Sequence, residues 1–314
     1  MLDIIVVNWN AGEQLHQMMQ SIAEHHSNLV QTVIIVDNAS VDFSIDGIER
    51  GFKNSGFEIN IIRNNVNVGF GSACNQGAKV STSEYLLFLN PDTLLFKDTL
   101  RVAIDFMNKP EQSDVGVCGI QLIDEHSVVS RSCARFPTPL IFFLNSFGLN
   151  KLKIFASYSL HMNDWDHLST RTVDHVIGAF YLVKNSLFKK LLGFDERYFV
   201  YLEDLDLSYR LKQEGYRCVY LVEAQSFHKG GGTSNQIKAI RLFYSLRSRL
   251  LYAHNHFNKA GFCIVLTTTL IIEPLFRVVY TILLLSWSQF IETLVGYKKL
   301  YGWLPTWLIM GKTR

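Results

Sequence analysis

The chain has 314 residues, of which 48% are hydrophobic and 18% charged, and its formal net charge is +2. Enough apolar residues are present to form a core, which excludes a disordered or fibrous protein. A net charge so close to zero also argues against a general nucleic-acid-binding protein, which would normally be strongly basic.

The charge is distributed unevenly along the chain. Residues 1–237 contain 20 basic and 26 acidic residues, whereas residues 238–314 contain 10 basic and 2 acidic residues. Such an asymmetry indicates that the C-terminal end faces a negatively charged surface. The five cysteines are odd in number and widely spaced, so neither a disulfide framework nor a structural zinc site is expected. The apolar run 2–7 follows the first methionine at once and predicts a strand rather than a signal peptide, which places the bulk of the protein in the cytoplasm.

The first 120 residues alternate between short apolar runs and amphipathic segments. Gly12–His25 has apolar residues at helical spacing, and helical segments are also expected at 77–80 and 99–107. Strands separated by helices predict a parallel sheet that is covered on both faces, and therefore an α/β fold. Such sheets bind ligands at the carboxyl ends of their strands. The predicted strands are Leu2–Val7, Val33–Val36, Ile59–Ile62, Tyr85–Leu89 and Val115–Cys118.

The segment 120–170 is less regular and rich in aromatic residues and proline, and we interpret it as an excursion that shapes an acceptor site. A second ordered block begins at Thr172, with a helix predicted near 185–192. A further helix is expected to end near Gly215, and a strand follows at 217–222.

The C-terminal tail contains an uncharged stretch, Gly261–Ile272, which Glu273-Pro274 interrupts. Because a spanning helix needs about 20 predominantly apolar residues, we favour two interfacial helices joined at Glu273-Pro274 over a single kinked span. The tail also supplies tryptophans and tyrosines for the headgroup level and basic residues for anionic lipid. A hydrophobic helical hairpin packed on the main domain, or in an oligomer, is the alternative.

Two polar clusters follow the first two strands. Asn8 lies in Val7-Asn8-Trp9-Asn10, and Asp37 and Asn38 lie in Val36-Asp37-Asn38-Ala39-Ser40. Such residues often only cap helices or form turns. At the ends of adjacent parallel strands, however, they offer donors and acceptors suited to a nucleobase and ribose.

The third cluster is the glycine-rich turn Asn67-Val68-Gly69-Phe70-Gly71, which leads to Asn75. A turn of this kind entering a helix presents free backbone N–H groups to an anion. Its spacing is not that of the dinucleotide fingerprint, and it follows the third strand rather than the first. The fourth cluster, Asn90-Pro91-Asp92, places a carboxylate after a buried strand, where it either holds a divalent cation or forms a simple turn.

Two further motifs lie in the second half of the chain. Glu203-Asp204 follows an aromatic-rich segment, and such surroundings raise the pKa of a carboxylate, which would suit a general base. The alternative is a purely structural role, in which the acidic residues of the first helical turn interact favourably with the helix dipole and Asp206 pairs with Arg210. His228 precedes a glycine-rich loop and could ligate a metal, although a lone histidine is often structural.

Taken in order, these motifs, together with Gly193-Phe194-Asp195-Glu196, resemble family 2 glycosyltransferases of the GT-A fold, in particular the bacterial rhamnosyltransferase-like branch. The resemblance covers residues 1–255. It implies an inverting transfer from a nucleotide-diphosphate sugar donor, with Mg²⁺ or Mn²⁺ on the diphosphate. It also implies a Rossmann-like, mostly parallel sheet flanked by helices.

The resemblance assigns roles to individual residues. Asp204 would be the base that deprotonates the acceptor, with Glu203 orienting the acceptor beside it. Asp92 and His228 would hold the metal, and Asn90 stands where many relatives have a first Asp. Nucleotide-sugar contacts would come from Asn8, Asp37, Asn38, Asn67, Gly69, Gly71, Asn75 and Asn90, and acceptor contacts from Gly178, Ala179 and Asp195.

The predicted domains are a transferase domain over 1–255, with a nucleotide-sugar half (1–120) and an acceptor half (121–255), and a basic apolar tail over 256–314. We expect transfer of rhamnose from dTDP-rhamnose to a polyprenyl-diphosphate-linked saccharide of a surface polysaccharide. The expected partners are the donor, a lipid-linked or saccharide acceptor and an anionic membrane surface, with no nucleic acid, at the cytoplasmic face of the inner membrane. Galactose, glucose, N-acetylglucosamine or a furanose could replace rhamnose, and a non-catalytic nucleotide-sugar-binding membrane scaffold is the alternative from another class.

Overall fold

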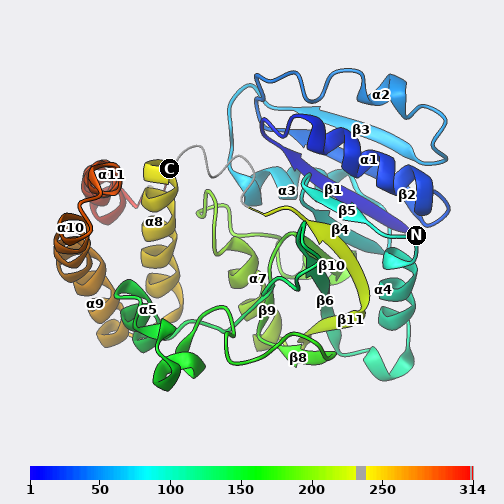
Figure 1. Ribbon diagram of the computed structural model, residues 1–314. Coiled ribbons are helices and arrows are strands. Elements are labelled where there is room, and N and C mark those ends of the chain that lie inside the picture. Colours follow the sequence, from blue (N-terminus) through cyan, green and yellow to red (C-terminus); the bar gives the residue numbers. More distant parts are fainter. Residues whose placement is uncertain (231–237, 312, 314) are drawn as a thin grey trace. The chain divides into compact units, whose positions relative to one another are not determined.

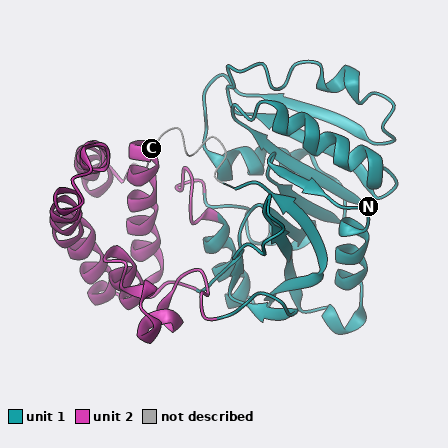
Figure 2. Cartoon of the chain, in the orientation of Figure 1, with its two compact units in different colours: residues 1–135, 165–195, 204–233 teal, residues 136–164, 196–203, 234–314 magenta. Residues whose placement is uncertain are grey.

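The structure is a computed structural model that describes residues 1–230, 238–311 and 313. The part of the glycine-rich loop after Gly230, and the basic residues Lys312 and Arg314, lie outside the described residues. The chain divides into two compact units, which Figure 2 shows in different colours. The first unit comprises residues 1–135, 165–195 and 204–233, and the second comprises 136–164, 196–203 and 234–314. Helix α8 (Lys238–His256) thus lies in the same unit as the tail, and the predicted domain boundary at residue 255 stays a prediction.

The first unit is built on a nine-stranded sheet with the order β3-β2-β1-β4-β10-β6-β11-β5, in which β8 pairs with β11, and a separate two-stranded sheet of β7 and β9 (Figure 1). Its strands are β1 (Leu2–Asn8), β2 (Val30–Asp37), β3 (Glu58–Arg63), β4 (Tyr85–Leu89), β5 (Thr93–Leu95), β6 (Val115–Ile123), β7 (Cys133–Ala134), β8 (Arg171–Val173), β9 (His175–Val176), β10 (Phe180–Lys184) and β11 (Arg217–His228). Its helices are α1 (Glu13–His25), α2 (Ile48–Gly51), α3 (Phe70–Val80), α4 (Thr99–Met107), the 3₁₀ turn η1 (Pro110–Gln112), α6 (Asn185–Lys190) and α7 (Glu203–Gln213).

The α/β fold class is confirmed, but the sheet is mixed rather than parallel throughout. Strands β1 to β4 run parallel, whereas β10 lies antiparallel between β4 and β6. Strands β5 and β8 are also antiparallel to β11. A strand buried on both faces is a continuous apolar run in either direction, so periodicity alone could not reveal that β10 is reversed.

Helices cover both faces of this sheet because its inner strands are apolar on both sides. The α1 residues Leu15, Met18, Met19 and Ile22 are fully buried against one face, as their spacing predicted. On the other face, α3 approaches so closely that a Cβ added to Gly77 would lie 2.7 Å from Ile5 Cγ2. The parallel strands therefore end along one edge, where the polar motifs of the sequence are found.

The second unit is helical. It consists of α5 (Pro139–Ser146), the 3₁₀ segments η2 (Leu149–Lys151) and η3 (Lys153–Tyr158), α8 (Lys238–His256), α9 (Lys259–Thr267), the π-helical turn η5 (Thr268–Ile272), α10 (Glu273–Leu283) and α11 (Trp287–Met310). Helix α11 packs against α8 and α10, and α5 packs against α9. Many large apolar side chains of α10, of α11 and of the connection between them are exposed, including Leu283, Leu285 and Trp287.

The predicted break between two helices at Glu273-Pro274 is wrong, because α9, η5 and α10 follow one another without a non-helical residue. Pro274 cannot donate to the carbonyl of Leu270, four residues earlier. The Tyr301 hydroxyl of α11 donates to that carbonyl instead, at 2.5 Å. By length and composition, Lys259–Leu283 is the one helix in the described part of the chain that could cross a membrane.

Candidate functional site

The ends of β1 and β2 form a closed polar network. The Asn8 amide donates to Asp37 Oδ1 at 2.8 Å, to Ser40 Oγ at 3.0 Å and to Ser44 Oγ at 2.9 Å. Asn8 is fully buried, and Asp37 is 6% exposed. The structure therefore brings the first two predicted clusters together, with the Asp37 carboxylate oriented by the Asn8 amide.

Asn38, which follows β2, extends this network to the glycine-rich turn. Asn38 donates to Asn67 Oδ1 at 2.9 Å and to the Gly69 carbonyl at 3.3 Å. Asn67 Oδ1 also accepts from the Gly69 N–H at 2.9 Å, and Gly69 has a φ of 85°, which is left-handed. Helix α3 starts at the next residue, and Gly71 is buried in its first turn. The glycine-rich turn thus presents a helix N-terminus beside the polar ends of β1 and β2, an arrangement suited to an anion.

Asn75 does not point into this network. Its amide donates to the Phe194 carbonyl and accepts from the Phe194 N–H, both at 2.9 Å. A Cβ on Gly193 would lie 2.5 Å from Asn75 Oδ1, and Gly193 has a φ of 71°. The geometry gives Asn75 the role of fixing the Gly193-Phe194 turn that carries Asp195, and it does not support the predicted nucleotide-sugar contact.

The predicted metal ligands are brought together from two strands. Asp92 lies in the turn between β4 and β5, and His228 ends β11, which pairs with β5. His228 Nε2 lies 3.4 Å from Asp92 Oδ1. An imidazole and a carboxylate so close can serve as two ligands of one divalent cation. No group of three or more His, Cys, Asp or Glu side chains able to hold a metal occurs among the described residues, so further ligands would have to come from a substrate or water.

The turn that carries Asp92 is tied to the segment before β10. The Ala179 carbonyl accepts from the Asn90 N–H at 3.1 Å and from the Thr93 hydroxyl at 3.4 Å. Phe180, the next residue, pairs with Leu89 of β4. The predicted acceptor residues Gly178 and Ala179 therefore adjoin the predicted metal ligands, which the separation of about 90 residues along the chain did not reveal.

Asp204 is anchored at both carboxylate oxygens. Its Oδ2 accepts from the Gly178 N–H at 2.8 Å, and its Oδ1 accepts from the Leu205 N–H at 2.8 Å. His175 Nε2 lies 3.5 Å from Oδ2, and 19% of the Asp204 side chain is exposed. The carboxylate is thus held in place and open to a substrate on one side.

The prediction that aromatic surroundings raise the pKa of Asp204 is wrong. Burial does act to raise this pKa, but the electrostatic interaction and hydrogen bond with His175 and the N–H groups of Gly178 and Leu205 stabilise the carboxylate, and the pKa is lowered. Asp204 is therefore ionised at neutral pH and able to accept a proton.

Sequence reasoning missed a buried chain of polar groups behind Asp204. His175 is 2% exposed, and its Nδ1 lies 2.9 Å from the Ser208 hydroxyl. That hydroxyl lies 3.0 Å from the Tyr181 hydroxyl. Ser208 follows Asp204 by one helical turn, so a polar residue on the inner face of α7 was the one available signal. The predicted pair of Asp206 and Arg210 is also present, with Arg210 Nε donating at 2.8 Å.

Two residues before Glu203-Asp204 have left-handed backbones. Tyr201 has a φ of 71° and Leu202 a φ of 67°. A left-handed backbone conformation at a non-glycine residue costs free energy, and such residues tend to occur at functional sites. Glu203 belongs to the second unit and is 4% exposed, so its role in orienting the acceptor stays a prediction.

Several known proteins are similar to this chain in sequence. Residues 3–170 match the profile described as Glycosyl transferase family 2. The chain is 29% identical over 227 residues to the rhamnosyltransferase WbbL of Escherichia coli K12, covering 71% of this chain and 76% of that protein. It is 23% identical over 270 residues to the N-acetylglucosaminyl-diphospho-decaprenol L-rhamnosyltransferase of Mycobacterium tuberculosis, covering 80% and 83% of the two chains.

A solved structure shares the fold. The mannosyltransferase PcManGT of Pyrobaculum calidifontis, in complex with GDP-Man and Mn²⁺, superposes with a TM-score of 0.57 at 15% identity. The match covers 96% of this chain and 86% of that chain.

Proposed function

The chain belongs to glycosyltransferase family 2, and from this premise we propose that it is an inverting transferase that moves rhamnose from dTDP-rhamnose to a polyprenyl-diphosphate-linked saccharide. That the chain is a glycosyltransferase and lies in the rhamnosyltransferase-like branch agrees with the resemblance that its motifs carry. The donor, the acceptor and the residue roles below are the proposal.

The observation that carries the proposal is the juxtaposition of an anchored carboxylate with a metal-ligand pair. Asp204 is held by the N–H of Gly178. The carbonyl of the next residue, Ala179, accepts a hydrogen bond from the Asn90 N–H in the turn that carries Asp92. Asp92 in turn lies beside His228. In this proposal, Asp204 is the base, and the site for the leaving diphosphate is connected to it through Gly178 and Ala179.

Asp204 would accept the proton of the acceptor hydroxyl as that oxygen attacks the anomeric carbon. The bond from that carbon to the diphosphate oxygen breaks on the opposite face, so the anomeric configuration inverts and no covalent enzyme intermediate forms. General-base assistance of this kind is typically worth about 10²–10⁴-fold in rate. The fixed position of the carboxylate contributes further, because a base that is already oriented needs no ordering during the reaction.

Asp92 and His228 fit a divalent cation, Mg²⁺ or Mn²⁺, with the donor's diphosphate and water as the remaining ligands. When bound there, the cation would neutralise charge that develops on the leaving nucleoside diphosphate. PcManGT, whose fold is similar, was solved with GDP-Man and Mn²⁺, which supports this proposal. The ends of β1 and β2, with Asn8, Asp37 and Asn38, would receive the nucleoside.

The two rhamnosyltransferases support rhamnose as the sugar. The name of the mycobacterial relative specifies a decaprenyl-diphosphate-linked substrate, which supports a lipid-linked acceptor. The exposed apolar residues of α10 and α11 fit a peripheral or monotopic position at the cytoplasmic face of the inner membrane. In this proposal residues 1–255 carry the transfer and residues 256–314 carry the membrane association.

A mass-spectrometric screen tests the function. The purified chain is incubated with dTDP-rhamnose and, separately, with UDP-sugars carrying galactose, glucose or N-acetylglucosamine, each with a polyprenyl-diphosphate-linked N-acetylglucosamine acceptor. We expect a mass increase of one deoxyhexose with dTDP-rhamnose. If only another sugar is transferred, dTDP-rhamnose is not the donor. If the donor is hydrolysed without transfer to the polyprenyl-diphosphate-linked acceptor, the assignment of a lipid-linked acceptor is refuted.

The variant Asp204→Asn tests the base. We expect donor binding to be kept and transfer to fall by about 10²–10⁴-fold. Asp174→Asn is the matched control, since it removes the same charge from a residue paired with the exposed Lys212 and should leave transfer unchanged. Full turnover by Asp204→Asn would remove Asp204 from the mechanism.

A further inference from the structure

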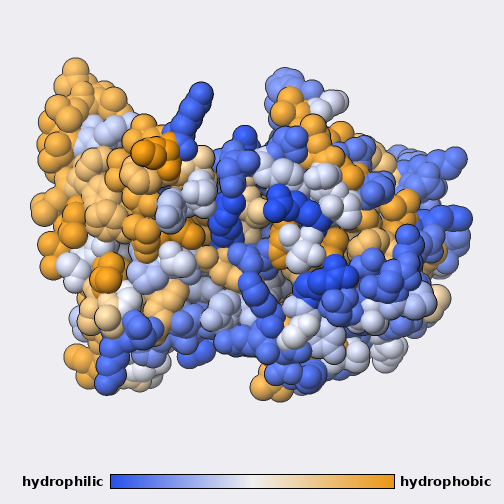
Figure 3. Space-filling model, turned by 90° about the horizontal axis from the view of Figure 1, so that it is seen from below, coloured by the Kyte–Doolittle hydropathy of each residue, from blue (hydrophilic) through white to orange (hydrophobic). Residues whose placement is uncertain are grey.

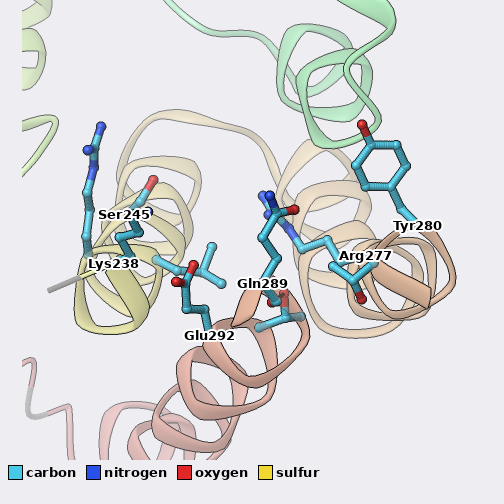
Figure 4. Close-up of a pocket in the computed structure, with 10 residues that line it drawn as sticks. Lys238, Ser245, Arg277, Tyr280, Gln289 and Glu292 are labelled. Atoms are coloured by element: carbon cyan, nitrogen blue, oxygen red, sulfur yellow. Dashed lines mark hydrogen bonds between the residues drawn. The ribbon is translucent and has the colours of Figure 1, made fainter. Parts of the chain in front are cut away.

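The helical unit contains a cavity of about 460 Å³ that is lined by residues of α8, α10 and α11 alone. Helix α8 contributes Lys238 and Arg241, α10 contributes Arg277, and α11 contributes Gln289 and Glu292. Figure 4 shows the labelled side chains of these three helices around one space. None of these residues takes part in the proposed chemistry.

The cavity has an excess of positive charge, with three basic residues and one carboxylate, Glu292, in its lining. Glu292 Oε1 accepts from the Ser288 hydroxyl at 3.0 Å. Lys238 and Arg241 are exposed and lie one turn apart on α8. The cavity therefore suits an anion that has more than one oxygen.

Arg277, which lines the cavity, is kept in place by the buried carboxylate of Glu273. Its Nε and Nη2 both lie 2.8 Å from Glu273 Oε1, and Arg249 pairs with the other oxygen of the same carboxylate. Glu273 is fully buried. Two guanidinium groups share one carboxylate, so one positive charge of the group is not neutralised. Because 36% of the Arg277 side chain is exposed, this charge lies on the side of the cavity.

Exposed apolar residues occur where α10 ends and α11 begins. Leu283 is 76% exposed, Leu285 is 91% exposed and Trp287 is 72% exposed, and all three lie between Tyr280 and Gln289 of the cavity wall. Figure 3 shows apolar surface gathered over these C-terminal helices, on the left of the view. A soluble anion would leave this surface in water, whereas a lipid bilayer would cover it.

We propose that the cavity binds the phosphate-bearing headgroup of an anionic phospholipid, with Lys238, Arg241 and Arg277 around the phosphate. This proposal rests on the membrane association put forward above, and it adds a specific binding site for a lipid headgroup to that association. The apolar side chains between α10 and α11 enter the acyl boundary at the same time, so that one layer of helices provides both interactions that interfacial binding requires.

Vesicle binding tests the site on the full chain. The wild type is sedimented with vesicles of phosphatidylglycerol and phosphatidylcholine, and with vesicles of phosphatidylcholine alone. The double variant Lys238→Gln/Arg241→Gln is compared with Lys298→Gln/Lys299→Gln, which removes two exposed charges from α11 outside the cavity. Thermal unfolding of each variant checks that the helices remain folded.

The wild type should prefer the anionic vesicles, and the cavity variant should lose about 30-fold in affinity, since each basic residue contributes about five-fold. The control variant should lose clearly less. Equal losses in the two double variants, or no preference for phosphatidylglycerol, would overturn the proposal, because either result means diffuse attraction only.

Inorganic phosphate distinguishes a lipid headgroup from a soluble anion. Inorganic phosphate lacks acyl chains, so it should compete only weakly for the cavity and should release the wild type from anionic vesicles only near the ionic strength at which chloride does so. Release by phosphate well below that ionic strength would overturn the lipid assignment and indicate a soluble phosphate ligand. The assay needs no sugar transfer, so its failure and the failure of the proposed transferase activity are separate results.

Discussion

Replacing Gly178 with Ala tests whether the position of Asp204, rather than its presence alone, sets the rate. A Cβ at residue 178 would lie 3.2 Å from Asp204 Oδ2 and 3.7 Å from Phe70 Cε1. The second distance is an ordinary contact, but the first requires the carboxylate to move by a few tenths of an ångström. Both carboxylate oxygens are anchored at 2.8 Å, by the N–H groups of Gly178 and Leu205, so any such movement lengthens one of these bonds.

The size of the effect follows from the displacement. A misplacement of about 1 Å can cost about 10²-fold in rate, so a few tenths of an ångström should lower kcat by about three- to tenfold. Stability should change little, because Gly178 has no left-handed φ and the loss of unfolded-state freedom on Gly→Ala substitution stabilises by about 0.4–1 kcal/mol. That gain offsets the close contact.

The assay is steady-state transfer, with kcat and the donor KM measured separately and thermal unfolding followed in parallel. Gly302→Ala in α11 is the matched control, since its Cβ would meet nothing within 4 Å, and kcat should be unchanged. The reasoning is refuted if Gly178→Ala retains full kcat, or if its loss of activity is matched by a large loss of stability.

Three further changes probe the site and the helical unit. His175→Gln should move the acid limb of the pH–kcat profile to higher pH, because burial then raises the pKa of Asp204 against less opposition; an unmoved limb would contradict this. The same lowered pKa means that ionised Asp204 stabilises the fold above its unfolded-state pKa, and that this contribution is lost as the pH falls through the folded-state pKa. Asp92→Ala should weaken donor binding about tenfold or more in the presence of Mn²⁺, and an unchanged calorimetric affinity would remove its role as a ligand. Glu273→Gln should lower the free energy of unfolding by about 3–5 kcal/mol, since it leaves Arg249 buried without a counter-charge; chemical denaturation that matches the wild type would show that the ion group is dispensable.

The tail illustrates how a local rule is overridden by packing. Glu273-Pro274 predicts a helix break, because proline removes one backbone donor and a charge is costly to bury. In the structure residues distant in sequence help to offset both costs. Tyr301 hydrogen-bonds the Leu270 carbonyl, for which Pro274 supplies no N–H donor, and Arg249 joins the neighbouring Arg277 in neutralising Glu273. Neither Tyr301 nor Arg249 can be identified from periodicity.

The sequence by itself determined the elements and the family. The apolar runs and the helical spacing of α1 indicated an α/β sheet, and the order of the polar motifs at strand ends indicated a glycosyltransferase. These features depend on residues close together in the chain, where spacing translates directly into a shared face or a shared strand end.

Only the tertiary structure decided which of these residues meet. Antiparallel β10 brings Gly178 and Ala179 to the turn that carries Asp92, and the register of β11 on β5 brings His228 to the same place. The structure also placed His175 behind Asp204, which reversed the expected direction of its pKa shift. Burial, which the sequence indicated, raises that pKa, but His175 and the Gly178 N–H, which help to outweigh it, come from a segment distant in sequence, and only folding brings them within range of Asp204.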